Sequence, residues 1–430
     1  MRTLLRIGMT RDEFHAACDS LLGTYALKIG MPSASTDLVS IQVAEGDRLL
    51  CFLTDGTLSY VEYKGGIFME GSEKAPPSGT AAPAPAAPHK AHHSAEEEER
   101  RTTFLELFFD LVLVFAITQL TSMLHDVPHH HPGHELAGWA HTGLLAAMIW
   151  WLWSQFAWLG TSVRLQHRLP QAVMLVLTGL MLVAAVMLPV ALNPEVAIFG
   201  VAYALVKLGA VALYRIDTGG DHRHAAAVAD YTRKASIAPL IVLAGSFLPP
   251  TPRIALWTLA VAVEIGGALL VGNSAFRISP THFAERHALV LIIVLGEAVV
   301  ALGGKAVASE MDLPTIGAFL GGFALIASLW WSYFGWTFGA AESWLKGHGR
   351  PFAPGDHGAV GRMARDAFTF GHFPIVTGVI AMAVALKDLA GAPLEPWHHE
   401  AQVAMAVGLI LYLGGFVAVV LRGKGYLLVG

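Results

Sequence analysis

The stretch TFLELFFDLVLVFAITQL, residues 103–120, decides the fold class of this chain. It is apolar enough for a membrane-spanning helix, which needs about 20 consecutive, mainly apolar residues. It nevertheless carries Glu106 and Asp110, whose spacing places both carboxylates on one face of a helix. An acid inside a bilayer costs about 3 kcal/mol on insertion scales and normally faces protein or water. The segment therefore predicts a spanning helix that packs against a polar interior.

The composition of the whole chain agrees with a membrane protein. Of its 430 residues, 54% are hydrophobic and 14% are charged, and the mean hydropathy is +0.53. Soluble domains carry about 25% charged residues, so the serial apolar stretches from residue 100 to 430 predict an all-α polytopic membrane protein. The net charge of −5 argues against a nucleic-acid partner. The only cysteines, Cys18 and Cys51, fit a reducing compartment.

Residues 1–74 are predicted to form a small soluble α+β module. Thr10 to Glu13 is a capping-box pattern that opens a helix to about Leu22. Short β-rich runs follow, separated by Gly-containing turns, and predict a three- or four-stranded meander. We interpret the module as a packing or docking appendage, open to a cytoplasmic partner, and expect no signal peptide before it. Residues 75–99, rich in Pro, Ala, His and Glu, are predicted to be a disordered linker.

The membrane domain is predicted to contain about ten spanning helices. Arg and Lys are concentrated in alternate loops, whereas the intervening loops hold Arg253, Lys305 and Lys387. The positive-inside rule then places both termini in the cytoplasm of a multi-pass protein of the inner (plasma) membrane. The predicted spans are about 104–124, 137–160, 171–191, 195–214, 235–249, 253–272, 284–303, 314–337, 366–386 and 401–421.

Three pairs of similar segments occur in the same order and predict an internal repeat. WSQFAW at residues 153–158 resembles WSYFGW at 331–336, and the stretches that begin at Phe104 and Phe283 also match. VLTGLMLVAAVMLPVA from Val176 resembles IVTGVIAMAVALKDLA from Ile375. Equivalent helices are six spans apart, so the copies share one orientation, as in a parallel repeat. The alternative is convergent Trp-rich interface sequence. The second copy has four spans against six, so two spans were lost or the chain ends early.

Five ionisable residues on the predicted spans are candidates for an ion or solute pathway. Glu106 lies near the cytoplasmic boundary. An ordinary acid that stabilises the helix N-terminus explains its presence there nearly as well as a pathway role does. Asp110 lies one turn deeper and needs a polar neighbour. Lys207, on the fourth span, suits one of the acids as a counter-ion, and the sequence does not say which. Glu264 on the sixth span and Glu297 on the seventh complete the set, and Glu297 fits an interhelical hydrogen bond equally well.

Further polar residues open the later spans. Glu285 and Arg286 start the seventh span beside His282 and His287, as a boundary anchor or as part of a pathway. His372 precedes Pro374, so it either relays protons or binds a carbonyl that the proline frees.

The outer loop from His125 to Glu135 has the side chains of a Zn²⁺ or Cu²⁺ site, but its prolines favour a solvated loop, so we predict no metal. We predict no other cofactor. No catalytic triad or nucleotide-binding motif occurs, so we do not expect an enzyme.

The segments FLELFFDLVLVFAITQL, HFAERHALVLIIVLGEAVVALG and GHFPIVTGVI resemble the three hallmark segments of the bacterial low temperature requirement A family. The resemblance covers about residues 100–430. It implies a multi-spanning membrane protein linked to growth at low temperature, and it carries no settled molecular activity. The residues that correspond by motif are Glu106, Phe109, Asp110, Gln119, Glu285, Arg286, Gly296, Glu297, His372 and Pro374.

The first helix also resembles, more weakly, the aromatic Phe-Asp motif of the lysosomal potassium channel family. In the second copy Val290 or a close neighbour stands where that family would need an acid, which argues against a shared filter.

The sequence therefore predicts a transporter or channel-like permease for a small solute or cation, with proton coupling as an option. Asp110 is the candidate coupling or binding acid, with Glu106 at its cytoplasmic entrance and Glu297 as a second site. The alternative is a non-transporting membrane scaffold or stress factor that supports growth at low temperature. A lipid-modifying enzyme ranks third because no nucleophile and base pair is evident. The expected partners are the lipid bilayer and a small solute or ion, and a homo-oligomer stays open.

Overall fold

The computed structural model divides the chain into two compact units, residues 1–86 and 87–430. In the first unit it describes residues 27–29, 36–44, 47–54 and 57–64. In the second unit it describes residues 102–130, 134–163, 167–216, 232–270, 278–308, 312–345 and 357–424. The predicted helix near residues 10–22 and the linker at 75–99 lie outside these ranges.

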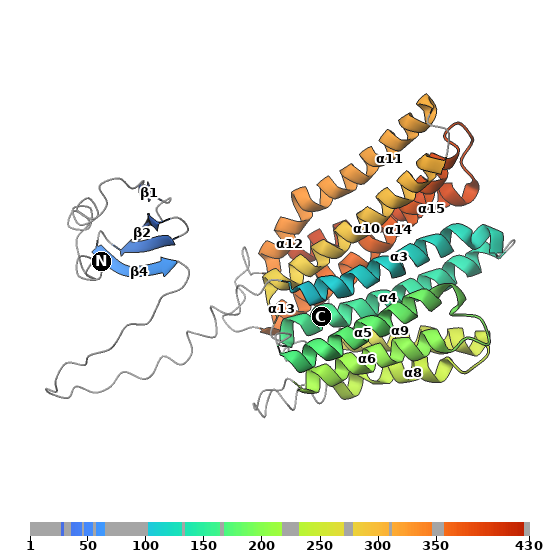
Figure 1. Cartoon of the computed structure of the whole chain (residues 1–430), viewed down its shortest axis with the longest axis horizontal. Coiled ribbons are helices and arrows are strands. Elements are labelled where there is room, and N and C mark those ends of the chain that lie inside the picture. The colour runs from blue at the N-terminus through green and yellow to red at the C-terminus, as the bar shows by residue number, and fades with distance from the viewer. Residues whose placement is uncertain are drawn as a thin grey trace. The chain divides into compact units, whose positions relative to one another are not determined.

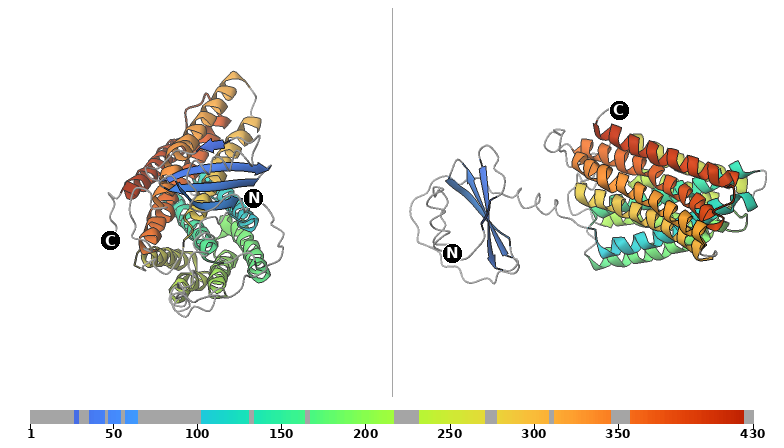
Figure 2. Two further views of the ribbon diagram at one scale, coloured as in Figure 1. Left: turned by 90° about the vertical axis from the view of Figure 1, so that its left-hand side faces the viewer. Right: turned by 90° about the horizontal axis from the view of Figure 1, so that it is seen from above.

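The described residues of the first unit form one antiparallel sheet (Figure 2). Its strands follow the chain in the order β1-β2-β3-β4, so each strand pairs with its sequence neighbours. In register, Cys51 of β3 lies between Val39 of β2 and Val61 of β4. The strands are β1 (Leu27–Ile29), β2 (Thr36–Ala44), β3 (Asp47–Thr54) and β4 (Thr57–Lys64).

The described residues of the second unit are helical, and Figures 1 and 2 show the long helices side by side in one bundle. The elements of its first part are α3 (Phe104–His130), α4 (Glu135–Ser162), α5 (Arg168–Met187), η1 (Leu188–Val190), α6 (Ile198–Ile216), α8 (Ile237–Gly245) and α9 (Pro250–Leu270). The elements of its second part are α10 (Pro280–Ala308), α11 (Leu313–Ser332), η3 (Tyr333–Thr337), α12 (Phe338–Leu345), α13 (His357–Met363), η4 (Ala364–Phe370), α14 (Gly371–Gly391) and α15 (His399–Lys424).

Eight helices of the described region are long and apolar enough to cross a membrane. The other two predicted spans coincide with α4 and α8. Helix α4 has 28 residues, about 42 Å at 1.5 Å per residue, but His141 and Gln155 and its tryptophans lower its hydropathy. It packs in the bundle centre, where Leu152 and Trp153 have no exposed surface. Helix α8 has nine residues, too few to span alone. The polytopic fold is therefore present, and the count of ten stays a prediction.

Equivalent helices of the predicted repeat have equivalent neighbours. Helix α3 contacts α4 and α5, and α5 contacts α6; likewise α10 contacts α11 and α14, and α14 contacts α15. The two sets join where α3 and α4 contact α10 and α14. This pattern agrees with a duplication, and the repeat itself stays a prediction.

Two π-helical turns interrupt the second half of the bundle. The segment η3 separates α11 from α12, and η4 separates α13 from α14. Pro374 lacks an N–H and its ring would collide with the carbonyl four residues earlier, so the chain widens just before it. A π-turn leaves backbone carbonyls without their usual helical partners, and such turns are frequent at functional sites.

The Arg253 side chain holds the ends of three elements together, and all of its hydrogen-bond partners are backbone carbonyl groups. Its guanidinium is 1% exposed. It donates to five carbonyl oxygens at 2.6–3.1 Å, those of Ala191, Asn193, Pro194, Val196 and Ser246. The residue that the sequence placed in an outer loop is therefore a buried structural cation.

Helices α14 and α15 approach so closely that glycine is required at their contact. A Cβ atom at Gly378 would lie 2.6 Å from the carbonyl oxygen of Gly408 and 2.7 Å from the backbone nitrogen of Tyr412. A Cβ atom at Gly415 would lie 2.9 Å from the carbonyl oxygen of Gly371. Small residues at such contacts allow helices to pack by van der Waals attraction within a bilayer.

We expect Gly378→Ala and Gly415→Ala to destabilise the protein by about 1–3 kcal/mol, because the new methyl group collides with backbone atoms. Gly414→Ala is the matched control, since a Cβ there meets nothing within 4 Å, and alanine is the better helix former by about 1 kcal/mol. Thermal unfolding midpoints in detergent measure the difference. Equal midpoints for all three variants would contradict this packing.

Candidate functional site

The first carboxylate of α3 closes a capping box. Glu106 Oε2 accepts hydrogen bonds from the backbone N–H and the hydroxyl of Thr103, at 2.8 and 2.9 Å. The Glu106 N–H donates back to the Thr103 hydroxyl at 3.3 Å. These bonds satisfy N–H groups that a helix start leaves unpaired. Glu106 is nevertheless 1% exposed, so the predicted contact with interfacial water does not occur in this structure.

Helix α10 supplies the positive side of the same cluster. Arg286 Nη2 donates to Asp110 Oδ1 at 2.7 Å, and its Nη1 lies 3.2 Å from Glu106 Oε1. His282 Nε2 lies 3.1 Å from Glu106 Oε1. Each helix contributes two residues that are four apart, so the two polar faces match along their length. We call Glu106, Asp110, His282 and Arg286 the acid–base cluster.

Helix α4 covers the acid–base cluster. Trp153 Nε1 donates to Asp110 Oδ1 at 2.9 Å, and its ring lies 5.9 Å from the Arg286 guanidinium. Gly160 leaves room for Glu106, because a Cβ atom at this position would collide with Glu106 Oε1. All four cluster residues are at most 1% exposed, so their charges interact in a dry, low-dielectric environment.

The cluster has two carboxyl groups and one permanently charged base. Charges that are removed from water must be paired, and one guanidinium cannot balance two carboxylates. One further positive charge makes the cluster neutral. Asp110 Oδ2 and His282 Nδ1 have no hydrogen-bond partner among the described residues. A proton is the smallest cation that such an arrangement accommodates.

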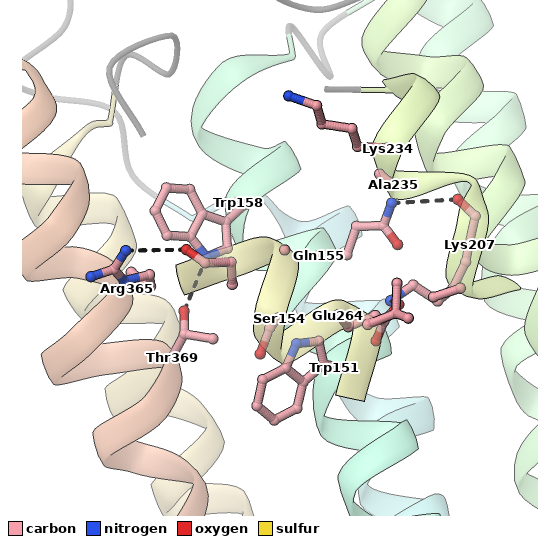
Figure 3. Close-up of a pocket in the computed structure, with 14 residues that line it drawn as sticks. Trp151, Ser154, Gln155, Trp158, Lys207, Lys234, Ala235, Glu264, Arg365 and Thr369 are labelled. Carbon is pink, nitrogen blue, oxygen red and sulfur yellow. Dashed lines mark hydrogen bonds and ion pairs between the residues drawn. The ribbon is translucent and has the colours of Figure 1, made fainter. Parts of the chain in front are cut away.

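A separate, partly open pocket of about 160 Å³ lies between α4, α6, α8, α9 and η4 (Figure 3). Lys207 of α6 and Glu264 of α9 form an ion pair on its wall. Lys207 Nζ also lies 5.7 Å from the centre of the Tyr203 ring. The structure thus pairs Lys207 with Glu264, the choice that the sequence left open. We call this cavity the α4–α9 pocket.

The opposite wall of the α4–α9 pocket comes from η4. Arg365 Nη1 donates to the Ala268 carbonyl at 3.1 Å, and Arg365 Nε donates to Asp366 at 2.6 Å. Asp366 also accepts from Arg422 Nε of α15 at 2.7 Å. Thr369 accepts from Trp158 Nε1 at 3.0 Å. The lining residues Trp158, Arg365 and Thr369 are thus fixed by bonds between elements, so this wall is preorganised.

His372 binds a carbonyl of the π-turn. Its Nδ1 lies 2.9 Å from the Ala367 oxygen, and since a carbonyl accepts only, this nitrogen donates. The Tyr333 hydroxyl then donates to Nε2 at 2.6 Å. Both ring nitrogens are therefore occupied in a hydrogen-bonded link between η3 and η4. This geometry agrees with the structural alternative for His372, and the relay of protons stays a prediction.

The remaining predicted site residues are apart from both sites. Glu297 Oε2 accepts from Thr118 at 2.6 Å, which is a bond between α10 and α3. Glu285 accepts from the Thr102 hydroxyl at 3.1 Å. Gln119, next to Thr118, is half-buried.

No group of three or more metal-ligating side chains occurs in the described ranges. Of the predicted outer loop, residues up to His130 belong to α3, and residues 131–133 lie outside those ranges.

Sequence analysis missed several residues of both sites. Trp153 belongs to the repeat motif WSQFAW, and it gave no sign of a bond to Asp110. Ser154 and Gln155 of the same motif line the α4–α9 pocket. A polar pair inside a predicted span was the available signal for them.

We expect Arg286→Gln to destabilise the protein by about 3–5 kcal/mol, because it leaves two carboxylates buried without a cation. Asp110→Asn should restore part of this loss in the double variant, since it removes one of the stranded charges. A double-mutant cycle on unfolding midpoints in detergent should give a coupling of at least about 1 kcal/mol. Additive effects would show that the two side chains do not interact.

Comparison with known proteins identifies the family of the helical unit. The family model for the bacterial low temperature requirement A protein (LtrA) matches residues 101–428. An uncharacterized protein of Rhizobium meliloti (strain 1021) is 28% identical over 329 residues, which is 74% of this chain and 76% of that protein. No solved structure shows a significant match. The family match covers all of the described helices, and the chain therefore belongs to the bacterial low temperature requirement A family.

Proposed function

We propose that this membrane protein is a permease for a small solute and that the acid–base cluster couples transport to protons. The α4–α9 pocket is the observation that carries the proposal. It is a partly open cavity inside a bundle of apolar helices, and its wall holds Lys207, Glu264 and Arg365. Ionisable groups inside membrane helices usually face the protein interior or a water-filled cavity and seldom face lipid. At such places they mark solute and ion pathways.

A scaffold explains the acid–base cluster but not the pocket. Interhelical bonds need charges that are paired, and the cluster provides them. The pocket is instead a partly open cavity inside the bundle, lined by Lys207, Glu264 and Arg365. A space of this kind costs stability in a packed interior, so a scaffold would gain from filling it with side chains.

Helix α4 provides a physical link between the two sites. Trp153 donates to Asp110 in the cluster, and the next residue, Ser154, lines the pocket. Gln155 donates to the backbone carbonyl of Lys207 at 3.4 Å. A proton that rearranges Asp110 and Trp153 would therefore shift the pocket wall, and small helix shifts of this kind underlie many two-state transitions.

The ion pairs of the structure reduce the support for a preference for cations. That expectation depended on the net negative charge of Asp110, Glu264 and Glu297 against the single base Lys207. Here Arg286 pairs with Asp110 and Glu106, and Lys207 pairs with Glu264. The proposed substrate is therefore a small solute, and the proposed coupled ion is a proton. The proposal assigns no chemical reaction to the protein. The inner membrane, the cytoplasmic termini, a homo-oligomer and a partner for residues 1–74 stay predictions.

We expect Asp110→Asn to abolish solute-linked proton movement in proteoliposomes, because the cluster loses the acid that contacts both Arg286 and Trp153. The measurement is internal pH after the addition of candidate solutes, with wild type beside the variant. Asp388→Asn is the matched control, since Asp388 is partly exposed and binds His398 at the other end of α14. Unfolding midpoints must accompany each flux measurement.

Two results would contradict the proposal. Proton movement in folded Asp110→Asn equal to wild type would remove the cluster from the mechanism. Well-folded wild type that moves no proton with any of a wide series of solutes would favour the scaffold. The scaffold also predicts a lower midpoint for Asp110→Asn without any flux to lose.

A further inference from the structure

An open, mainly apolar groove of about 320 Å³ runs along one face of α15. Its α15 wall consists of residues three or four apart, from Ile410 to Arg422. The opposite wall comes from Leu269 of α9 and from Phe370 and Pro374, where η4 continues into α14. Figure 2 shows α15 in red at the edge of the bundle. We call this feature the α15 groove.

The α15 groove is open on the outside of the bundle. Ile410 is 69% exposed and Leu269 is 43% exposed. A Cβ atom at Gly414 would meet nothing within 4 Å, so the middle of the groove holds no side chain. Helix α15 is long and apolar enough to cross a membrane, and the part of a spanning helix that protein leaves uncovered faces hydrocarbon. A lipid chain therefore reaches the groove directly.

The dimensions of the groove match one hydrocarbon chain. The distance from Ile410 to Arg422 along the helix is about 18 Å at 1.5 Å per residue, close to half of the hydrocarbon core of about 30 Å. Over this length, 320 Å³ gives a cross-section of about 18 Å². A helix with its side chains is about 10 Å across and needs about 80 Å². The groove thus fits an extended chain from one leaflet and is too narrow for another helix.

One end of the α15 groove carries a positive charge. Arg422 and Asp366 line this end, and Arg422 Nε donates to Asp366 Oδ2 at 2.7 Å. Asp366 Oδ1 accepts from Arg365 Nε at 2.6 Å. A single carboxylate therefore serves two guanidinium groups, and the three side chains together keep one net positive charge.

The Arg422 guanidinium is fixed on one side and available on the other. Its bond to Asp366 uses Nε, and its two terminal nitrogens donate to no side chain or carbonyl of the described residues. The side chain keeps 12% of its surface exposed, and neither terminal nitrogen is a buried atom. A guanidinium in this state suits a phosphate group, whose oxygens accept two parallel hydrogen bonds.

We propose that the α15 groove binds one acyl chain of an anionic phospholipid, whose phosphate accepts hydrogen bonds from Arg422. Basic pockets between spanning helices recognise anionic headgroups in this way. A zwitterionic lipid has the same phosphate, but its own cation cancels the attraction to the net charge of the site. The sequence predicts the cytoplasmic side for this end of α15, which is the leaflet that attracts basic segments. The site does not depend on the proposed transport.

Lipid binding to the full-length protein tests the proposal. The delipidated protein in detergent receives phosphatidylglycerol or phosphatidylcholine with identical acyl chains, or glycerol 3-phosphate, and native mass spectrometry counts the bound molecules. We expect one phosphatidylglycerol to bind at least about fivefold more tightly than phosphatidylcholine, the effect of one basic residue near an anionic group. Equal binding of the two lipids, or binding of glycerol 3-phosphate as tight as that of phosphatidylglycerol, would overturn the proposal.

Arg422→Gln tests the headgroup contact. It removes the charge and should lower phosphatidylglycerol binding to the level of phosphatidylcholine, whose binding should not change. Arg168→Gln is the matched control, because Arg168 is an exposed arginine at the start of α5. Asp366 keeps its bond to Arg365 in the variant, and the ratio of the two lipid affinities does not report on stability. An unchanged ratio in Arg422→Gln would overturn the assignment.

Gly414→Leu tests the acyl-chain contact. Its side chain enters the groove without a collision at Cβ, and leucine is the better helix former, so we expect an unfolding midpoint no lower than that of the wild type without lipid. Both lipids should bind more weakly. Gly296→Leu is the matched control, since Gly296 of α10 is exposed and a Cβ there also meets nothing within 4 Å.

Two results with Gly414→Leu would contradict the proposed occupant. Unchanged binding of both lipids would show that the chain lies elsewhere. A wild-type dimer without bound lipid, which dissociates in Gly414→Leu and not in Gly296→Leu, would assign the groove to a second copy of the protein. The same mass spectra report both results.

Discussion

The contact of Arg286 with Asp110 and Glu106 is the interaction on which the arrangement of the bundle depends. None of the three residues has more than 1% of its surface exposed. A guanidinium in such a place cannot lose its proton and cannot be left without anions. Helices α3 and α10 must therefore meet along their first turns, although 176 residues separate Arg286 from Asp110. The glycine at position 160 and the indole of Trp153 accompany this contact, because α4 approaches closely and Trp153 donates to the same Asp110 oxygen that Arg286 binds.

Helix α4 then becomes the common wall of two polar sites. Its Trp153 reaches the cluster, its Trp150 and Trp158 donate to Thr369 of η4, and Gln155 reaches α6. A helix that is surrounded by protein needs no lipid-compatible surface, which explains why it carries polar residues and indoles. The Thr369 carbonyl, which accepts from Trp150, belongs to the π-turn before Pro374. The proline thus contributes indirectly to the position of the pocket.

The sequence revealed the requirement for polar partners but not their identity. Asp110 on an apolar span predicted a polar interior, because the cost of a buried acid depends on the residue alone. Its pairing with Arg286 depends on which helix faces come together, and local patterns do not encode that. Lys207 had four acids of the predicted spans available, and packing selected Glu264. Arg253 had the charge of an outer loop residue, yet five backbone carbonyls surround it. Pro374 predicted a disturbed helix, whereas the π-turn at η3 follows no proline or other local signal.

The buried charges of this protein are of two kinds, and the difference bears on function. Arg253 and His372 lie outside the α4–α9 pocket: carbonyls accept from both terminal nitrogens of Arg253, and each ring nitrogen of His372 has one bond. Such residues hold helices together. Arg365 and Glu264 also have bonds that fix their positions, but both residues line a single cavity. A side chain that is fixed by bonds and lines a cavity is preorganised for a ligand, because binding then costs little conformational freedom. This difference supports the proposed role of the α4–α9 pocket as the solute site, with the acid–base cluster beside it as the proposed site of the coupled proton.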